Sequence, residues 1–464
     1  MDSRQRALLI LPVENQVREL DSKLLFGCFA VERGFDVILG SRSYVNYAMT
    51  KLRKGVFVAK SMRRRSALML NIIRDLGHQV VAWDEESLVR FESEEYDSWR
   101  FSEKTFSSID HLFAWGDDDA SMFSRYQGLG HTKVHVTGNP RMDLLRKEFR
   151  AVFSEQVKRI HQKYGEFILI NTNFSFVNSF VKDLNLLVPN NSGAEMEVTR
   201  TGEGMSEKFA LGMFRHQERI ARSFVSLMSA ISLGKPETKF VLRPHPSENH
   251  DFWRRVTSGL PNIEVVHEGN VIPWILACRM LVHNGCTTAV EATLLEKPVI
   301  SYQPIYSECY DYHLPNGLSR QAGTEQEVLQ LIDMIEKAET LEANRVDCGL
   351  LKKHLSASKG LFASERILDV LESEIRSVNG DKRIDSIRFV KAWLMGTART
   401  TLKKINSIRP GHRNSKLYHD HRFPKISSEE LQNKVRIMDS LVHRFGFVKI
   451  KPFSENLFLM GRDG

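Results

Sequence analysis

The first group of residues suited to chemistry contains a histidine between two prolines. Arg243-Pro244-His245-Pro246 follows the apolar residues 240–242, which predict a buried strand. The prolines restrict the backbone around His245 and remove two main-chain donors. A histidine fixed in this way can hydrogen-bond a phosphate or supply positive charge as a phosphate leaves. A loop histidine that only caps neighbouring backbone is the alternative. We predict a catalytic role for His245, with Arg243 and Pro246 in the same nucleotide-binding loop.

The second group lies in residues 277–303, which predict a strand, a glycine turn and a helix. It reads His283-Asn284-Gly285-Cys286-Thr287-Thr288 and continues to Glu291. The N–H groups of a helix start, with two hydroxyls, suit a phosphate, and a glycine permits close backbone approach. A carboxylate one turn into the helix can bind ribose hydroxyls. The threonine can instead be a simple N-cap, and the carboxylate can simply complement the helix dipole. The predicted nucleotide-binding residues here are Asn284, Gly285, Thr287, Thr288 and Glu291.

The third group is acidic and follows a predicted strand in the first half of the chain. Trp83-Asp84-Glu85-Glu86-Ser87 begins where the apolar residues 78–83 end. In open α/β sheets, ligands bind outside the carboxyl ends of the strands. A carboxylate at this edge can take a proton from an acceptor hydroxyl. An acidic helix N-terminus is the alternative. We predict that Asp84 or Glu85 is the catalytic carboxylate.

Strands and helices must alternate along the chain to position these groups. Short apolar runs predict strands at 7–13, 35–39, 54–59, 78–83, 111–115 and 133–137, with helical periodicity between several of them. A second series of strands is predicted at 167–171, 238–243, 263–267, 280–283 and 298–302. The polar stretch 173–207 predicts a long loop or lid. This alternation predicts parallel sheets with helices on both faces.

The predicted organisation has three parts. Residues 1–150 form an N-terminal Rossmann-like domain that carries the acidic group suited to an acceptor, and residues 151–375 form a C-terminal Rossmann-like domain that carries the two nucleotide-binding groups. Residues 376–464 form a basic helical C-terminal extension. The fold class is therefore α/β, with two Rossmann-like domains and a cleft between them.

The positive charge of the chain is concentrated near its C-terminus. Residues 381–425 hold twelve Lys and Arg against three Asp, a net of +9, whereas the whole chain carries +8. A basic block on a near-neutral body favours an acidic partner such as anionic lipid. Residues 384–405 have a helical pattern with apolar positions among the basic ones. This helix can lie on an anionic membrane surface or pack back onto the first domain.

Other bulk features narrow the function classes. The start of the chain lacks a signal-peptide pattern, and no apolar run reaches the length of a membrane-spanning helix. The five cysteines are scattered without paired spacing, so neither disulfides nor structural zinc is predicted. The basic block lacks the interleaved aromatic residues of a nucleic-acid-binding motif. We expect a cytoplasmic protein without a nucleic-acid partner.

Together these groups resemble GT-B glycosyltransferases. The resemblance rests on the two Rossmann-like halves, on Thr-Gly-Asn-Pro-Arg-Met-Asp at residues 137–143, and on the segment His-Asn-Gly…Glu-Ala…Lys-Pro-Val-Ile that starts at His283. The chain is similar to the bacterial surface carbohydrate biosynthesis proteins, which share the layout of capsule Kdo transferases and bacterial sialyltransferases. The resemblance covers residues 7–375.

The resemblance implies roles for several residues. In that wider group an acidic motif supplies the catalytic carboxylate, which matches Asp84 or Glu85 here. A His-Pro motif and a downstream Ser/Thr motif hold the phosphate of a CMP-sugar, which matches His245-Pro246 and Thr287-Thr288. The acidic motif of the group usually ends in Gly, whereas this chain has Ser87.

The function predicted from the resemblance is transfer of a sugar, such as Kdo or another ulosonic acid, from a CMP-linked donor. The acceptor would be a cell-surface glycan or a lipid-linked glycan at the inner face of the cytoplasmic membrane, and neither a metal nor another cofactor would be needed. UDP-sugar 2-epimerases share the segment from His283, so an epimerase is an alternative. A CDP-polyol phosphotransferase of similar architecture and a non-enzymatic scaffold for surface-glycan assembly are the others.

Overall fold

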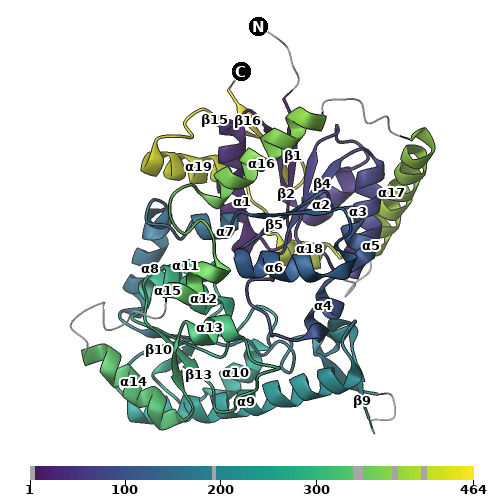
Figure 1. Cartoon of the computed structure of the whole chain (residues 1–464). Coiled ribbons are helices and arrows are strands. Elements are labelled where there is room, and N and C mark those ends of the chain that lie inside the picture. Colours follow the sequence, from purple (N-terminus) through teal and green to yellow (C-terminus); the bar gives the residue numbers. More distant parts are fainter. Residues whose placement is uncertain (1–5, 191–194, 338–347, 379–384, 409–414, 464) are drawn as a thin grey trace. The chain divides into compact units, whose positions relative to one another are not determined.

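The chain forms two compact α/β units in a computed structural model that describes residues 6–190, 195–337, 348–378, 385–408 and 415–463 (Figure 1). Unit 1 comprises residues 1–85, 101–152 and 353–464, and unit 2 comprises residues 86–100 and 153–352. Residues 381–384 and 409–414 of the basic block lie outside the described residues.

Unit 1 is built on an eight-stranded sheet in the order β15-β16-β2-β1-β3-β4-β5-β6. Its strands are β1 (Leu8–Val13), β2 (Asp36–Ser41), β3 (Val56–Ala59), β4 (Gln79–Trp83), β5 (His111–Ala114), β6 (Lys133–Val136), β15 (Val448–Ser454) and β16 (Leu457–Arg462). The strands β1 to β6 pair in parallel. All six residues of β1 are buried, as is typical of a parallel strand covered on both faces.

Helices connect and cover these strands. They are α1 (Gln16–Glu32), α2 (Arg42–Ala48), α3 (Ala67–Asp75), α5 (Glu103–Phe106), α6 (Asp117–Arg125), α7 (Pro140–Asp143), α16 (Ala363–Val378), α17 (Ser386–Ser407), α18 (Lys416–Arg422) and α19 (Ser428–Val442). The described part of 376–464 thus lies in unit 1, with α17 packed on α3 and α2 and α19 packed on α1. The basic helical pattern of residues 384–405 allowed two arrangements, on a membrane surface or packed back onto the first domain, and α17 has the second.

The C-terminal hairpin extends the sheet of unit 1, and the sequence pattern did not predict it. Strand β16 pairs antiparallel with β2, with Leu457 opposite Gly40. A side chain at Gly40 would lie only 2.1 Å from the carbonyl oxygen of Asn456, so glycine permits this close approach. The main-chain N–H of Ser41 donates to the same carbonyl at 3.0 Å.

The segment Thr-Gly-Asn-Pro-Arg-Met-Asp has a structural role within unit 1. The side chain of Asn139 caps α7 by accepting a hydrogen bond from the N–H of Arg141. The buried carboxylate of Asp143 accepts hydrogen bonds from the N–H groups of Ala363 and Ser364, both at 2.9 Å. This carboxylate therefore ties α7 to the start of α16, where anionic groups are favoured by the helix dipole.

Unit 2 contains a six-stranded parallel sheet in the order β11-β10-β7-β12-β13-β14 and a small antiparallel hairpin, β8-β9. The strands are β7 (Ile168–Asn171), β8 (Leu187–Pro189), β9 (Met196–Val198), β10 (Phe240–Arg243), β11 (Ile263–Val265), β12 (Leu281–His283), β13 (Val299–Tyr302) and β14 (Arg320–Ala322). The helices are α4 (Glu94–Arg100), α8 (Ser154–Tyr164), α9 (Glu207–Gly234), α10 (His250–Val256), α11 (Val271–Ala277), α12 (Thr287–Leu294), α13 (His313–Gly317) and α14 (Glu325–Lys337). The chain returns to unit 1 within α15 (Cys348–His354).

Two α/β sheets, one parallel and one parallel from β1 to β6, confirm the predicted fold class of two Rossmann-like units. The predicted loop or lid at 173–207 contains the β8-β9 hairpin, and Thr199 ties it to Asn185 through a hydrogen bond from its hydroxyl. Between α7, which ends at Asp143, and the first strand of unit 2, the chain forms α8, which begins at Ser154. Among the described residues, none of the helices is both long enough and apolar enough to cross a membrane.

Candidate functional site

Unit 2 has a topological switch point at the carboxyl end of its central strand. From β7 the chain adds β10 and β11 on one side, then crosses back to add β12, β13 and β14 on the other. Ligands of open α/β sheets bind in the crevice that such a reversal leaves at the carboxyl ends. Here those ends are Asn171 of β7 and His283 of β12, which are paired in register.

The loop after β10 carries His245 and is organised by a buried carboxylate. Oε1 of Glu248 accepts hydrogen bonds from the main-chain N–H of His245 at 3.0 Å, the hydroxyl of Thr172 at 2.9 Å and the N–H of Phe174 at 3.1 Å. Its Oε2 accepts from the indole of Trp253 at 2.8 Å. Burial raises the pKa of Glu248, against the effect of these donors. The carboxylate therefore joins the His245 loop to the segment after β7.

The imidazole of His245 is oriented by its own loop. Its Nδ1 accepts a hydrogen bond from the N–H of Ser247 at 3.2 Å, which leaves the proton of the neutral ring on Nε2. The main-chain carbonyl of His245 lies 3.2 Å from Nε2 of His250. Pro246 is exposed beside it. The ring therefore offers Nε2–H as a donor, the form that can bind a phosphate oxygen.

Arg243 contacts protein groups in this structure. Its guanidinium donates to the carbonyls of Glu268 at 2.7 Å and Gly269 at 3.1 Å, and it lies over the ring of Trp274 at 4.9 Å. Burial lowers its pKa to about 10, so the guanidinium stays charged at neutral pH. These contacts join β10 to the turn at 268–269. A nucleotide contact for Arg243 stays a prediction.

The loop after β12 is tied to the same segment that holds the His245 loop. Oδ1 of Asn284 accepts a hydrogen bond from the N–H of Asn173 at 2.8 Å, and its amide donates back to the carbonyl of Asn173 at 3.4 Å. Residues 172–174 therefore contact both loops, which brings His245 and Asn284 to one edge of the sheet.

Buried His283 shapes the glycine turn. Its Nδ1 accepts a hydrogen bond from the N–H of Gly285 at 2.8 Å, and its Nε2 lies 2.8 Å from the hydroxyl of Ser319. Burial lowers the pKa of His283 to about 3, so the ring is neutral at ordinary pH. Gly285 has φ +81°, and a side chain there would lie 2.9 Å from the ring of Tyr312. Glycine is therefore required at this turn.

Helix α12 presents its N-terminus after this turn. Its N-cap, Cys286, makes no side-chain capping bond, and the first N–H groups of a helix have no partner within it. The hydroxyl of Thr288 is buried without a hydrogen-bond partner among the described residues. Glu291, one turn further, is 1% exposed. Thr287 and Thr288 are thus placed where a helix dipole favours an anion, and Glu291 lies deeper.

Asn171 is a candidate that the sequence pattern did not single out. It ends β7 at the switch point, between Arg243 of β10 and His283 of β12 in the register of the sheet. It is 3% exposed, and its Oδ1 has no hydrogen-bond partner among the described residues. The only signal in the sequence was a polar residue at the end of an apolar run.

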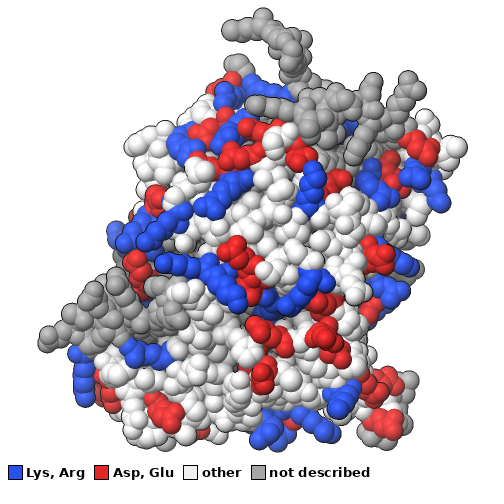
Figure 2. Space-filling view, viewed as in Figure 1, with Lys and Arg blue, Asp and Glu red and all other residues white. Residues whose placement is uncertain are grey.

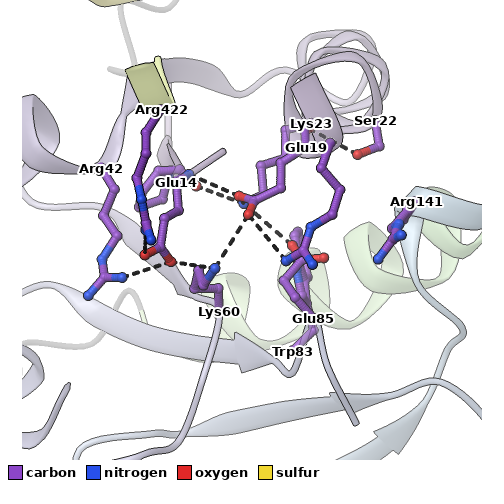
Figure 3. Close-up of polar contacts among 12 residues, drawn as sticks. Glu14, Glu19, Ser22, Lys23, Arg42, Lys60, Trp83, Glu85, Arg141 and Arg422 are labelled. Atoms are coloured by element: carbon purple, nitrogen blue, oxygen red, sulfur yellow. Dashed lines mark hydrogen bonds and ion pairs between the residues drawn. The ribbon is translucent and has the colours of Figure 1, made fainter. Parts of the chain in front are cut away.

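Unit 1 has its own switch point, between β1 and β3. Glu14 follows β1 and Lys60 follows β3, and the two side chains form an ion pair at this point. Glu14 also pairs with Arg42 at 2.9 Å and with Arg422 of α18 (Figure 3). Burial would raise the pKa of Glu14, but the charges of Lys60, Arg42 and Arg422 outweigh it and lower this pKa well below its ordinary value.

A buried ion-pair network connects this switch point to the predicted catalytic carboxylates. Glu19, 1% exposed, pairs with Lys23 at 2.8 Å and with Lys60 at 3.4 Å. Lys23 lies 3.4 Å from Oε1 of Glu85. Burial opposes ionisation of Glu19, yet Lys23 and Lys60 keep its pKa well below the ordinary value. Figure 3 shows these side chains in one continuous row.

Asp84 and Glu85 follow β4, as predicted, and both are buried. Oε1 of Glu85 also accepts a hydrogen bond from the indole of Trp83 at 2.8 Å. The carbonyl of Asp84 accepts from the indole of Trp115 at 2.6 Å. The structure thus places these residues in unit 1 and places His245, Asn284, Gly285, Thr287, Thr288 and Glu291 in unit 2. Within the described chain, no cluster of three or more His, Cys, Asp and Glu is arranged to hold a metal.

Two Rossmann-like units, each with polar residues at a switch point, define an open α/β fold in which ligands bind at the carboxyl ends of the strands. No protein-family model and no curated protein sequence matches the chain. Solved structures with a similar fold include UDP-GlcNAc 2-epimerase of Methanocaldococcus jannaschii, with 12% identity and a TM-score of 0.48 over 80% of this chain and 100% of that one. Anabaena HepE, with UDP and glucose, gives 12% identity and a TM-score of 0.42 over the same shares. The wall teichoic acid polymerase TagF gives 10% identity and a TM-score of 0.49 over 81% of this chain and 90% of that one.

Proposed function

We propose that this protein is a glycosyltransferase that moves a sugar from a nucleotide-sugar donor to a cell-surface glycan or a lipid-linked acceptor. The observation that carries the proposal is the switch point of unit 2, where the His245 loop and the N-terminus of α12 are joined through residues 172–174. Both features suit the phosphate of a nucleotide, and one edge of the sheet holds both.

The donor phosphate is proposed to bind between His245 and the start of α12. Nε2–H of His245 can donate to a phosphate oxygen, because Nδ1 already accepts from Ser247. The N–H groups and hydroxyls of Thr287 and Thr288 would hold other phosphate oxygens. Donors fixed in advance stabilise the charge that develops on a leaving phosphate, which makes a metal unnecessary in this proposal. Glu291 would lie near the ribose. We add Asn171 to the residues proposed to bind the nucleotide sugar.

The catalytic carboxylate is proposed to be Glu85 or Asp84, acting as base or nucleophile. For Glu85 the support is its fixed orientation, since Trp83 and Lys23 both contact Oε1. A base must reach the hydroxyl proton of the acceptor directly or through one water. For Asp84 the support is its place directly after β4.

The identity of the donor rests on the motifs His245-Pro246 and Thr287-Thr288. They match the pattern of CMP-sugar enzymes, so we propose a CMP-linked sugar such as Kdo or another ulosonic acid. The acceptors of such enzymes belong to capsule or lipopolysaccharide synthesis, which places the proposed reaction in the cytoplasm at the inner face of the membrane.

The test is a thermal-shift series with CMP, CDP, UDP and GDP. A nucleotide at 100 times its dissociation constant stabilises the folded state by about 2.7 kcal/mol. We expect CMP to stabilise the protein most. Stabilisation by UDP alone would overturn the CMP donor and favour a UDP-sugar enzyme.

Variants then connect the donor site to transfer. Replacing His245 by Ala should reduce kcat by about 10²-fold or more, as loss of one fixed donor to a developing charge does. Thr288→Ala tests the proposed phosphate contact of the Thr288 hydroxyl. Its control is Thr293→Ala, because the hydroxyl of Thr293 already donates to the carbonyl of Ala289 within α12. If His245→Ala leaves both CMP binding and transfer unchanged, the proposed phosphate role is wrong.

Three other functions share parts of this site. A UDP-sugar 2-epimerase has the same segment from His283 and would convert a nucleotide sugar without an acceptor. A CDP-polyol phosphotransferase would be stabilised by CDP and would transfer the polyol phosphate. A scaffold for surface-glycan assembly would give neither reaction. Incubation of the protein with nucleotide sugar, with and without acceptor, separates these outcomes.

A further inference from the structure

Helix α17 packs on unit 1 through its small residues. Ala392 is 3% exposed, and Gly396 lies so close to the neighbouring chain that an added side chain would meet Thr50 at 3.0 Å and Ile72 of α3 at 3.5 Å. These two residues are four apart and therefore share one face of the helix. The large side chains of α17 consequently face elsewhere.

The opposite face of α17 is apolar and exposed to solvent. The spacing of Ile387, Val390, Leu394, Ile405 and Ile408 keeps them on one side of the helix. Their exposed fractions are 81%, 54%, 56%, 53% and 83%, and Leu402 beside them is 61% exposed. A surface helix normally turns its apolar stripe to the core, so this solvent-facing stripe indicates a surface that something else covers.

The charges that flank this stripe have one sign. Between Ser386 and Ser407 the helix carries five basic residues and no acidic one, and the exposed N-cap Asp385 pairs with Arg388 at 3.4 Å. Arg388, Lys391 and Lys404 are exposed, and Trp393, at 43% exposed, lies at the side of the stripe. By contrast, Lys and Arg are interspersed with Asp and Glu on the face of the molecule drawn in Figure 2. The uniform charge of α17 is therefore a local property.

We infer that α17 docks the protein on an anionic membrane surface, with the stripe in the interfacial region and the flanking cations on lipid phosphates. A helix with bulky aliphatic residues on one face, a tryptophan at its side and Lys and Arg on its flanks lies in the plane of a membrane. Each Lys or Arg near an anionic surface increases binding roughly fivefold. A second copy is a poorer occupant, because two such helices would bring only like charges together.

Vesicle co-sedimentation of the full chain tests this inference. We expect binding to vesicles of phosphatidylcholine mixed with phosphatidylglycerol, weaker binding at high salt, and much weaker binding to phosphatidylcholine alone. The variant with Ile387→Ser, Leu394→Ser and Ile405→Ser together should bind the mixed vesicles at least tenfold more weakly. Because these side chains are exposed, the variant should keep the wild-type melting temperature.

The matched control is Leu233→Ser. Leu233 is 79% exposed at the end of α9, outside the basic segment, so its replacement should leave vesicle binding unchanged. Equal binding of wild-type protein to neutral and mixed vesicles would overturn the inference, and so would unchanged binding of the triple variant. A wild-type dimer that becomes monomeric in the triple variant, without vesicle binding by either, would assign the stripe to a second copy.

The inference goes beyond the proposed transfer reaction and does not depend on it. A protein without transferase activity would still bind the vesicles through α17. Conversely, a transferase that ignores vesicles would leave the proposed function standing and remove this inference.

Discussion

At the scale of single residues, the network in unit 1 depends on carboxylates that are buried among cations. Glu19 is the centre of this network, because its carboxylate contacts Lys23 at 2.8 Å, Lys60 at 3.4 Å and Arg18 at 3.6 Å. Removing one partner of a buried ion pair leaves the others without compensation. The network therefore fixes Lys23, and through Lys23 the position of Glu85.

Replacing Glu19 by Gln should lower the free energy of unfolding by up to about 3–5 kcal/mol, because buried Lys23 would keep only its longer contact with Glu85 and Lys60 only its pair with Glu14. Chemical denaturation measures this loss. Glu218→Gln is the control, since its pair with Arg222 is largely exposed and should change stability by about 0.5 kcal/mol or less. Equal effects of the two variants would show that the network is not a stabilising unit.

The buried His283 makes the stability of unit 2 sensitive to acid. Its pKa is lowered by burial to about 3, whereas an unfolded histidine titrates near 6.5. Between these pH values the unfolded chain binds more protons, so stability is full above about 6.5 and falls as pH decreases. The slope from this residue is at most about 1.4 kcal/mol per pH unit.

His283→Asn should remove this contribution while an amide oxygen still accepts from the N–H of Gly285. We expect a smaller loss of stability between pH 6.5 and 5 than in the wild-type protein. His313→Asn, at a partly exposed position on α13, is the control and should keep the wild-type slope. Parallel pH curves for wild-type protein and His283→Asn would exclude His283 as the acid-sensitive group.

At the scale of elements, the turn between β12 and α12 decides whether the helix N-terminus can face a ligand. Gly285 adopts φ +81° and leaves no room for a side chain beside Tyr312. Within the turn, the main-chain N–H of Gly285 donates a hydrogen bond to Nδ1 of His283. Its geometry thus depends on both backbone freedom and a buried acceptor.

Gly285→Ala should destabilise the protein by about 1–2 kcal/mol for the left-handed conformation, plus the cost of displacing Tyr312, and should weaken nucleotide binding. Gly259→Ala isolates the first effect, because Gly259 has φ +93° with open space around it. Thermal melts and nucleotide titration measure both quantities. If the two variants melt alike and bind nucleotide alike, the contact with Tyr312 has no influence.

At the scale of the whole molecule, the C-terminus completes the unit that the N-terminus begins. Strand β16 covers the edge of β2, and Phe445 packs on Phe29 of α1 with ring centroids 5.1 Å apart. An uncovered strand edge and an exposed apolar helix face promote aggregation.

A chain that ends after residue 427 should therefore be largely insoluble or aggregated, because α19 and the hairpin are lost. Soluble yield and gel filtration measure this effect. Lys451→Ser, at an exposed position of β15, is the control and should behave as wild type. A soluble monomer of the shortened chain with unchanged melting would show that unit 1 folds without its last strands.

Local patterns in the sequence were sufficient to predict most of the parallel strands and the positions of the three chemical groups. Apolar runs predicted β1 to β7 and β10 to β13, because most of these parallel strands are buried on both faces; the edge strands β6 and β11 are partly exposed. The same runs indicated which polar residues lie at carboxyl ends, since His245, Asn284 and Asp84 each follow one of them. The roles of these residues in binding and catalysis stay predictions.

Only the tertiary structure decided which distant residues meet. The local pattern around Glu19 contains no signal for Lys60, yet the packing of α1 over the sheet places the two side chains 3.4 Å apart. Likewise, β16 has no local signal for a partner 417 residues away, where Leu457 lies opposite Gly40. Amino-acid periodicity reports which faces of an element are apolar. Which element covers that face, and which charge lies at its edge, depends on long-range contacts that the local pattern does not contain.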